Sequence, residues 1–159
     1  MSATAQPNAE TKAIILALNS CIEACTDGQK GYAIAASDAR ASDLKVYLQR
    51  CSDKRAEFVL QLQRALRSFG GVPENQGSAR GALHRGWLDV RLAVEGRSDA
   101  VVLEECALGD GAARFVYERA LADTFEDLPR EVRMMLQAQY ASIGACRDEL
   151  ERRLRRNAC

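Results

Sequence analysis

Residues 77–87, GSARGALHRGW, decide the fold because they lie between two breaks near the middle of the chain. The first break is GGVP at residues 70–73, where glycine favours the left-handed backbone that ends a helix and proline prevents its continuation. The second break is EGRS at residues 95–98. The stretch is therefore predicted to be a crossover that joins two halves of the fold.

The crossover itself is predicted to contain one short helix. Ser78 is a typical N-cap residue, and the helix extends to about Val94. Its expected apolar anchors are Leu83, Trp87 and Leu88.

Four long helices flank the crossover, two before it and two after it. In each of them apolar residues recur every three to four positions, as one buried helix face requires. The predicted ranges are about 10–39, 42–68, 99–122 and 130–156.

Caps and glycines add local detail to these helices. Ser42 and Ser98 are the expected N-caps of the second and third long helices. Gly28 and Gly31 lie inside the first, where each costs about 1 kcal/mol. They predict that another backbone approaches closely there, or that the helix is locally irregular.

No alternating, strand-like pattern competes with these helices, so the fold class is all-α. The short connections predict two antiparallel hairpins, and residues 23–29 align with 104–110 without a gap. Two such hairpins joined by a long crossover are typical of a ferritin-like four-helix bundle, with a short extra helix in the crossover. Residues 1–8 are expected to be a flexible N-terminus, and residues 9–157 a single domain.

Composition limits the functional classes. The 159 residues contain 22 Lys and Arg against 22 Asp and Glu, so net charge gives no reason to expect a nucleic-acid partner. No apolar stretch approaches the roughly 20 residues of a membrane span, and the N-terminus lacks a signal-peptide pattern. We therefore expect a cytoplasmic protein with no membrane partner, whose 6 cysteines are free thiols.

A standard di-iron centre is excluded by count, because it needs two histidines and the chain has 1, His84, which lies on the crossover. A carboxylate-rich metal site remains an alternative to ordinary solvated carboxylates. Its candidate ligands are Glu23, Glu57, Glu105, Asp110 and Cys146.

Two cysteines are expected at the same level of the second hairpin. Cys106 and Cys146 lie about equally far from its turn, so they can form a thiol pair, with Cys25 as a further member. The alternative is that they are small buried apolar residues.

The crossover holds a candidate anion site or structural fastener. Its members are Arg80, His84, Arg85 and Trp87, with Arg80 near the capped N-terminus of the short helix. In the structural alternative, His84 and Trp87 lie together against the bundle, since residues three apart share a helix face.

Several segments resemble the bacterial ferritin-like four-helix-bundle proteins of largely unknown function, which are distantly related to the rubrerythrins. The similarity covers residues 18–148 and is carried by DGQKGY (27–32), GGVP (70–73), GS (77–78) with GALHRGW (81–87), EC (105–106), and LP (128–129) with Val132. The resemblance implies glutamate at the positions of Gln29, Gln61 and Asp110, and histidine at that of Cys146. The departures at these positions put the cation affinity of the family in doubt for this chain.

Two hypotheses follow. The first is a non-catalytic binding or stress-associated accessory protein with a degenerate or absent di-metal site, no cofactor, and a homodimer interface or an unknown protein partner on a bundle face. The second is a metal-binding or redox protein that uses interior carboxylates and thiols, with iron or another transition metal.

Overall fold

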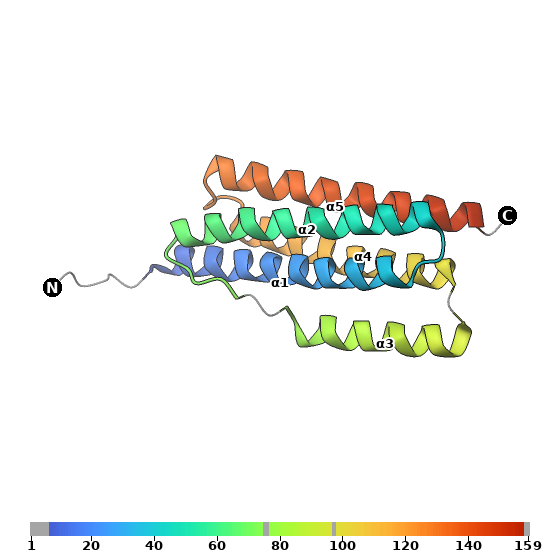
Figure 1. Ribbon diagram of the computed structural model, residues 1–159. Helices are drawn as coiled ribbons and strands as arrows, with labels where there is room; N and C mark the ends of the chain where they lie inside the picture. Colours follow the sequence, from blue (N-terminus) through green and yellow to red (C-terminus); the bar gives the residue numbers. More distant parts are fainter. Residues whose placement is uncertain (1–6, 75–76, 97, 158–159) are drawn as a thin grey trace.

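The computed structural model describes residues 7–74, 77–96 and 98–157 and is all-α, with no strand in these ranges (Figure 1). Five helices follow in order: α1 (Ala9–Asp38), α2 (Ser42–Ser68), α3 (Ala79–Glu95), α4 (Asp99–Thr124) and α5 (Arg130–Asn157). Each agrees with its predicted range to within two residues at either end. The predicted flexible segment 1–8 falls mostly outside the described residues, but Asn8 is ordered, and its side chain caps α1 by accepting from Thr11 N at 2.8 Å.

Helices α1, α2, α4 and α5 lie side by side, and α3 runs along the outside of α1 and α4 (Figure 1). The closest neighbours are α1 with α2, α4 with α5, and α1 with α4. Helices α2 and α5 approach each other closely at few positions. We call the region between them the α2–α5 seam.

Two apolar clusters fill the space between the helices. The first contains Leu18, Leu62 and Tyr117, and the second contains Leu48, Val102 and Leu150, all fully buried. Burial of each such side chain stabilises the fold by roughly 1.5–3 kcal/mol. The polar interior described below lies among these apolar residues.

Two of the predicted caps are confirmed and one is wrong. The Ser78 and Ser98 side chains accept hydrogen bonds from Gly81 N at 2.8 Å and Ala100 N at 3.2 Å. The N-cap of α2 is Ala41 and not Ser42, and it makes no side-chain cap.

The carboxylate of Asp99 supplies the hydrogen-bond acceptor that the α1–α2 turn lacks from its own side chains. It accepts from Arg40 N at 2.6 Å and from Ala41 N at 3.0 Å. The start of α4 is therefore fixed beside this turn, and α4 runs antiparallel to α1.

Helix α3 attaches through a different residue pair than the sequence predicts. Leu88 is buried as expected, together with Leu92. Leu83 is 76% exposed, so its prediction as an anchor is wrong. The physical reason is that Leu88 and Leu92 are one turn apart on the face toward the second apolar cluster, and Leu83 lies on another face.

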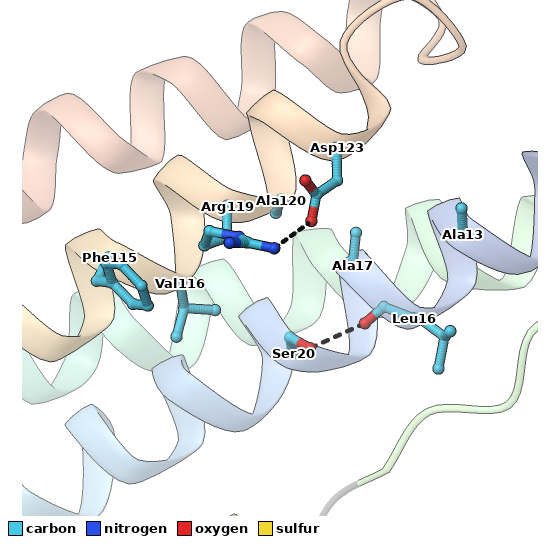
Figure 2. A pocket seen from close by; sticks show the side chains of 9 residues that line it. All are labelled: Ala13, Leu16, Ala17, Ser20, Phe115, Val116, Arg119, Ala120 and Asp123. Carbon is cyan, nitrogen blue, oxygen red and sulfur yellow. Dashed lines mark hydrogen bonds and ion pairs between the residues drawn. The ribbon is translucent and has the colours of Figure 1, made fainter.

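A shallow apolar groove of about 330 Å³ lies on the outer surface between α1 and α4 (Figure 2). Leu16 and Phe115 line it and are 69% and 62% exposed. Within the described residues, no helix is both long enough and apolar enough to cross a membrane.

Candidate functional site

A buried ion pair occupies the interior between α2 and α4. Arg55 Nη2 lies 2.6 Å from Asp110 Oδ1, and both side chains are 3% exposed. Removing two charges from water is costly, and the attraction between them repays that cost only in good geometry. The Asp110 charge accordingly raises the pKa of Arg55 against the opposing effect of burial.

Arg55 has a close-fitting environment. Its guanidinium carbon lies 5.8 Å from the ring centres of both Tyr32 and Phe58. A Cβ added to Gly28 would lie 3.3 Å from Arg55 Cγ and Nε, so this glycine makes room for the side chain. In the described part of the chain, Arg55 Nε has no hydrogen-bond partner.

A chain of hydrogen bonds leads from this ion pair to a pair of thiols. Tyr32 Oη donates to Asp110 Oδ2 at 2.6 Å. The distance from Tyr32 Oη to Cys146 Sγ is 3.2 Å, and from Cys146 Sγ to Cys51 Sγ it is 3.0 Å. Because the single hydroxyl proton of Tyr32 goes to Asp110, Cys146 must donate to Tyr32, and Cys51 must donate to Cys146.

The environments of the two thiols differ. The hydrogen bond from Cys51 lowers the pKa of Cys146, and that from Tyr47 adds to the effect, although burial and the Asp110 charge act in the opposite direction. The same thiol–thiol hydrogen bond, together with burial, raises the pKa of Cys51. Of the two, Cys146 is the one whose thiolate is favoured.

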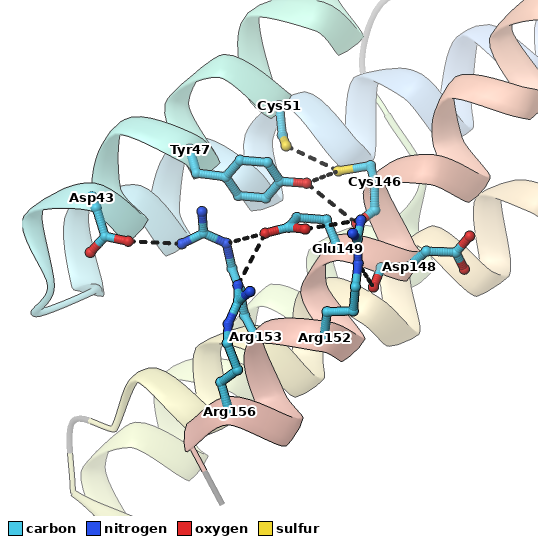
Figure 3. A network of polar contacts seen from close by, with 9 residues as sticks. All are labelled: Asp43, Tyr47, Cys51, Cys146, Asp148, Glu149, Arg152, Arg153 and Arg156. Atoms are coloured by element: carbon cyan, nitrogen blue, oxygen red, sulfur yellow. Dashed lines mark hydrogen bonds and ion pairs between the residues drawn. The ribbon is translucent and has the colours of Figure 1, made fainter. Parts of the chain in front are cut away.

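Tyr47 covers the thiols at the α2–α5 seam (Figure 3). Its hydroxyl lies 3.4 Å from both Sγ and the carbonyl oxygen of Cys146. Arg153 stacks 4.6 Å from the Tyr47 ring centre, and it binds Asp43 at 3.0 Å and Glu149 at 2.9 Å. Tyr47 therefore lies between Arg153 and Cys146 at the seam.

A second polar chain crosses the interior closer to the α4–α5 turn. Tyr117 Oη donates to Gln139 Oε1 at 2.7 Å, and Gln139 Nε2 donates to Gln61 Oε1 at 2.7 Å. Cys25 Sγ lies 3.1 Å from Tyr117 Oη and must be the donor, since the tyrosine proton is already used. Burial raises the pKa of Cys25 to about 11, so this thiol stays protonated.

The predicted metal ligands do not gather in one place. Asp110 and Cys146 share Tyr32 as a hydrogen-bond partner, as described above. Glu57 is exposed on α2, and Glu23 is half-buried on α1, where burial raises its pKa and the nearby Asp27 and Glu74 carboxylates raise it further.

Glu105 lies elsewhere, beneath α3, and is 3% exposed. It binds Arg91, and its Oε2 lies 3.3 Å from His84 Nε2. Among the described residues, no three His, Cys, Asp or Glu side chains are grouped to hold a metal ion.

The predicted thiol pair is arranged differently from the expectation. Cys106 and Cys146 both lie against the second apolar cluster, but the thiol in contact with Cys146 is that of Cys51. Burial, with the nearby Asp110 and Cys146, raises the pKa of Cys106. Cys25 makes no hydrogen bond to this pair among the described residues, because its thiol belongs to the hydrogen-bond chain of Tyr117.

The crossover residues face carboxylates. Arg85 Nη1 lies 3.4 Å from Asp27 Oδ1, and His84 faces Glu105 as described. Asp27 also accepts from the backbone and hydroxyl of Ser78. The side chains of Arg80 and Trp87 lie outside the described residues. His84 and Arg85 therefore fasten α3 to α4 and α1.

Sequence reasoning missed Arg55, Tyr32, Tyr47 and Cys51 as parts of one site. One signal was available: Gly28 already indicated a close approach to α1, and the approaching group is the Arg55 side chain rather than a backbone.

One family model matches the chain. It is described as "Domain of unknown function (DUF2383)" and matches residues 13–123, more than half of the 159 residues. The match includes Arg55 and Asp110 and ends before Cys146. No curated protein matches. The chain belongs to the DUF2383 family of domains of unknown function.

Proposed function

We propose that this protein is a cytoplasmic, ferritin-like four-helix bundle with an extra crossover helix, and that it acts as a non-catalytic binding or stress-associated accessory protein without a di-metal centre. The arrangement of two hairpins, α1–α2 and α4–α5, with α3 between them in the chain supports the architecture.

The Arg55–Asp110 pair is the observation that carries the proposal. Ferritin-like di-metal centres need four carboxylates and two imidazoles directed inward. Of the two carboxylates buried in the described residues, Glu105 lies beneath α3 and binds Arg91. The other, Asp110, lies between α2 and α4, where the Arg55 guanidinium already neutralises its charge. The neighbouring groups are phenols, thiols and the amides of Gln61 and Gln139. This donor set does not fit two hard cations, because amides and thiols do not supply their charge.

The alternative, a metal-binding or redox protein of the same fold, has one specific observation in its favour. That observation is the contact between the Cys51 and Cys146 thiols. It supports thiol chemistry at the seam and gives no support to a carboxylate metal site.

Metal titration tests the proposal. The melting temperature is measured with increasing Fe²⁺, Mn²⁺ and Zn²⁺ under reducing conditions. A ligand at 100 times its Kd stabilises a fold by about 2.7 kcal/mol, so specific binding would be readily seen. We expect no saturable stabilisation. Saturable stabilisation by any of these metals that disappears in Asp110→Asn would overturn the proposal.

We also propose that a second copy of the chain docks in the α1–α4 groove. Leu16 and Phe115 expose apolar surface on both sides of the groove, and Arg119 and Asp123 lie at its edge (Figure 2). Two copies related by a twofold axis can cover each other's apolar residues. Native mass is the measurement that tests this interface.

A further inference from the structure

The α2–α5 seam holds two thiols in direct contact, Cys51 Sγ and Cys146 Sγ, 3.0 Å apart. We propose that these cysteines form an oxidisable dithiol site. A hydroperoxide oxidises the two thiols to an intramolecular disulfide, which links α2 to α5. The inference goes beyond the accessory function proposed above, and it does not depend on whether the bundle binds metal.

The geometry of the seam favours the bond. A disulfide needs its sulfur atoms about 2.0 Å apart, so the thiols must approach by only about 1 Å. Helices α2 and α5 are close at fewer positions than α1 and α2 or α4 and α5, so the bond would join the two helices of the less tightly packed pair.

Access and hydrogen bonding favour Cys146 as the nucleophile that reacts with the peroxide first. It is partly exposed, whereas Cys51 is buried. It accepts the hydrogen bond of the Cys51 thiol, and Tyr47 lies across it at the surface (Figure 3). In the proposed reaction, Tyr47 rotates away from Arg153 to admit a small peroxide to Cys146.

The reaction balances in two steps. The sulfur of Cys146 attacks the peroxide oxygen, an S–O bond forms, the O–O bond breaks, and the thiol proton leaves with the alcohol or water. The sulfur of Cys51 then attacks the resulting sulfenic acid, an S–S bond forms, and the hydroxyl group leaves with the Cys51 proton as water. Two thiols are oxidised and one hydroperoxide is reduced.

The other described thiols lack this arrangement. Cys21 and Cys25 are fully buried, and Cys25 donates to a tyrosine. Cys106 is the nearest competitor, because it packs against the same cluster as Cys146. Within the described residues, no hydrogen bond joins its sulfur to another thiol, which makes Cys106 the matched control.

The test uses the full chain with Cys159→Ser, so that the last residue adds no reaction. The protein is reduced, freed of reductant, treated with a small excess of hydrogen peroxide, and mapped by mass spectrometry after tryptic digestion without reduction. We expect a linked peptide pair containing Cys51 and Cys146 in most molecules, and its loss after addition of dithiothreitol. Cys106→Ser is expected to give the same pair in the same yield.

Two variants resolve the order of the steps. Cys51→Ser is expected to accumulate a sulfenic acid at Cys146 that dimedone labels, and Cys146→Ser is expected to give neither label nor disulfide at this site. Circular dichroism and native mass verify that each variant folds, and the alanine variant at the same position, Cys51→Ala or Cys146→Ala, replaces a serine variant that does not fold. Fully reduced wild-type protein after peroxide treatment, or a disulfide that uses Cys106 or joins two chains, would overturn the inference.

Discussion

The Arg55–Asp110 pair predicts a strong and non-additive effect on stability. Asp110→Asn keeps an acceptor for Tyr32 but leaves the Arg55 charge buried at 3% exposure with no counter-charge. Breaking a buried pair in this way costs about 3–5 kcal/mol. Replacing both partners removes the buried charge altogether, so the double variant Arg55→Met/Asp110→Asn is expected to lose far less than the two single losses combined.

Urea unfolding of the wild type, both single variants and the double variant measures this coupling. For a domain of this size, a loss of about 3–5 kcal/mol lowers the melting temperature by roughly 6–20 °C. Glu151→Gln is the control, because its ion pair with Arg147 is largely exposed, lies outside the α1–α4 groove and is expected to contribute less than about 1 kcal/mol. Additive losses, or a loss below about 1 kcal/mol in Asp110→Asn, would refute the reasoning.

Three further predictions concern other parts of the structure. Gly31→Ala is expected to stabilise the protein by up to about 1 kcal/mol through helix propensity, because a Cβ added at Gly31 meets no other atom within 4 Å. Gly28→Ala is expected to gain nothing or to destabilise the protein, because its Cβ crowds Arg55. Equal gains in urea unfolding would contradict the close fit between Gly28 and Arg55. Phe115→Lys is expected to convert a dimer to a monomer by light scattering, and an unchanged native mass would exclude the groove as the interface. Partial burial favours a higher pKa for Glu149, but the hydrogen bond from Arg153 and the nearby arginine charges lower the pKa below its ordinary value of 4.5. The stability of the wild type over Glu149→Gln is therefore present above pH 4.5 and is lost as the pH falls through the lower folded pKa. A stability difference that grows toward acid pH would show the opposite sign.

Helix positions could be predicted from the sequence because their signals are local. Ser78 and Ser98 cap their own helices, and Gly70 ends α2 with a positive φ of 78°. Ser42 fails as a cap because Asp99, far away in the chain, already binds the amides at that turn.

The candidate site could be predicted only in part, because its contacts join different hairpins. Counting residues from the turn places Cys106 and Cys146 at one level of the second hairpin, but it says nothing about the level of Cys51 on α2. Arg55 follows the pattern of a surface residue, and only its partner Asp110 on α4 explains its burial. A periodic pattern predicts which face of a helix is buried, but it does not predict which residues of two helices from different hairpins lie at the same level.

Metal analysis of the protein as isolated tests the central claim most directly. The full chain is purified without a nickel column, and its iron, manganese, zinc and copper are measured against protein concentration. A guanidinium in the place of a metal pair predicts that each metal is far below one equivalent, in the wild type and in Asp110→Asn alike. Near-stoichiometric metal in the wild type that is lost in Asp110→Asn would contradict the account.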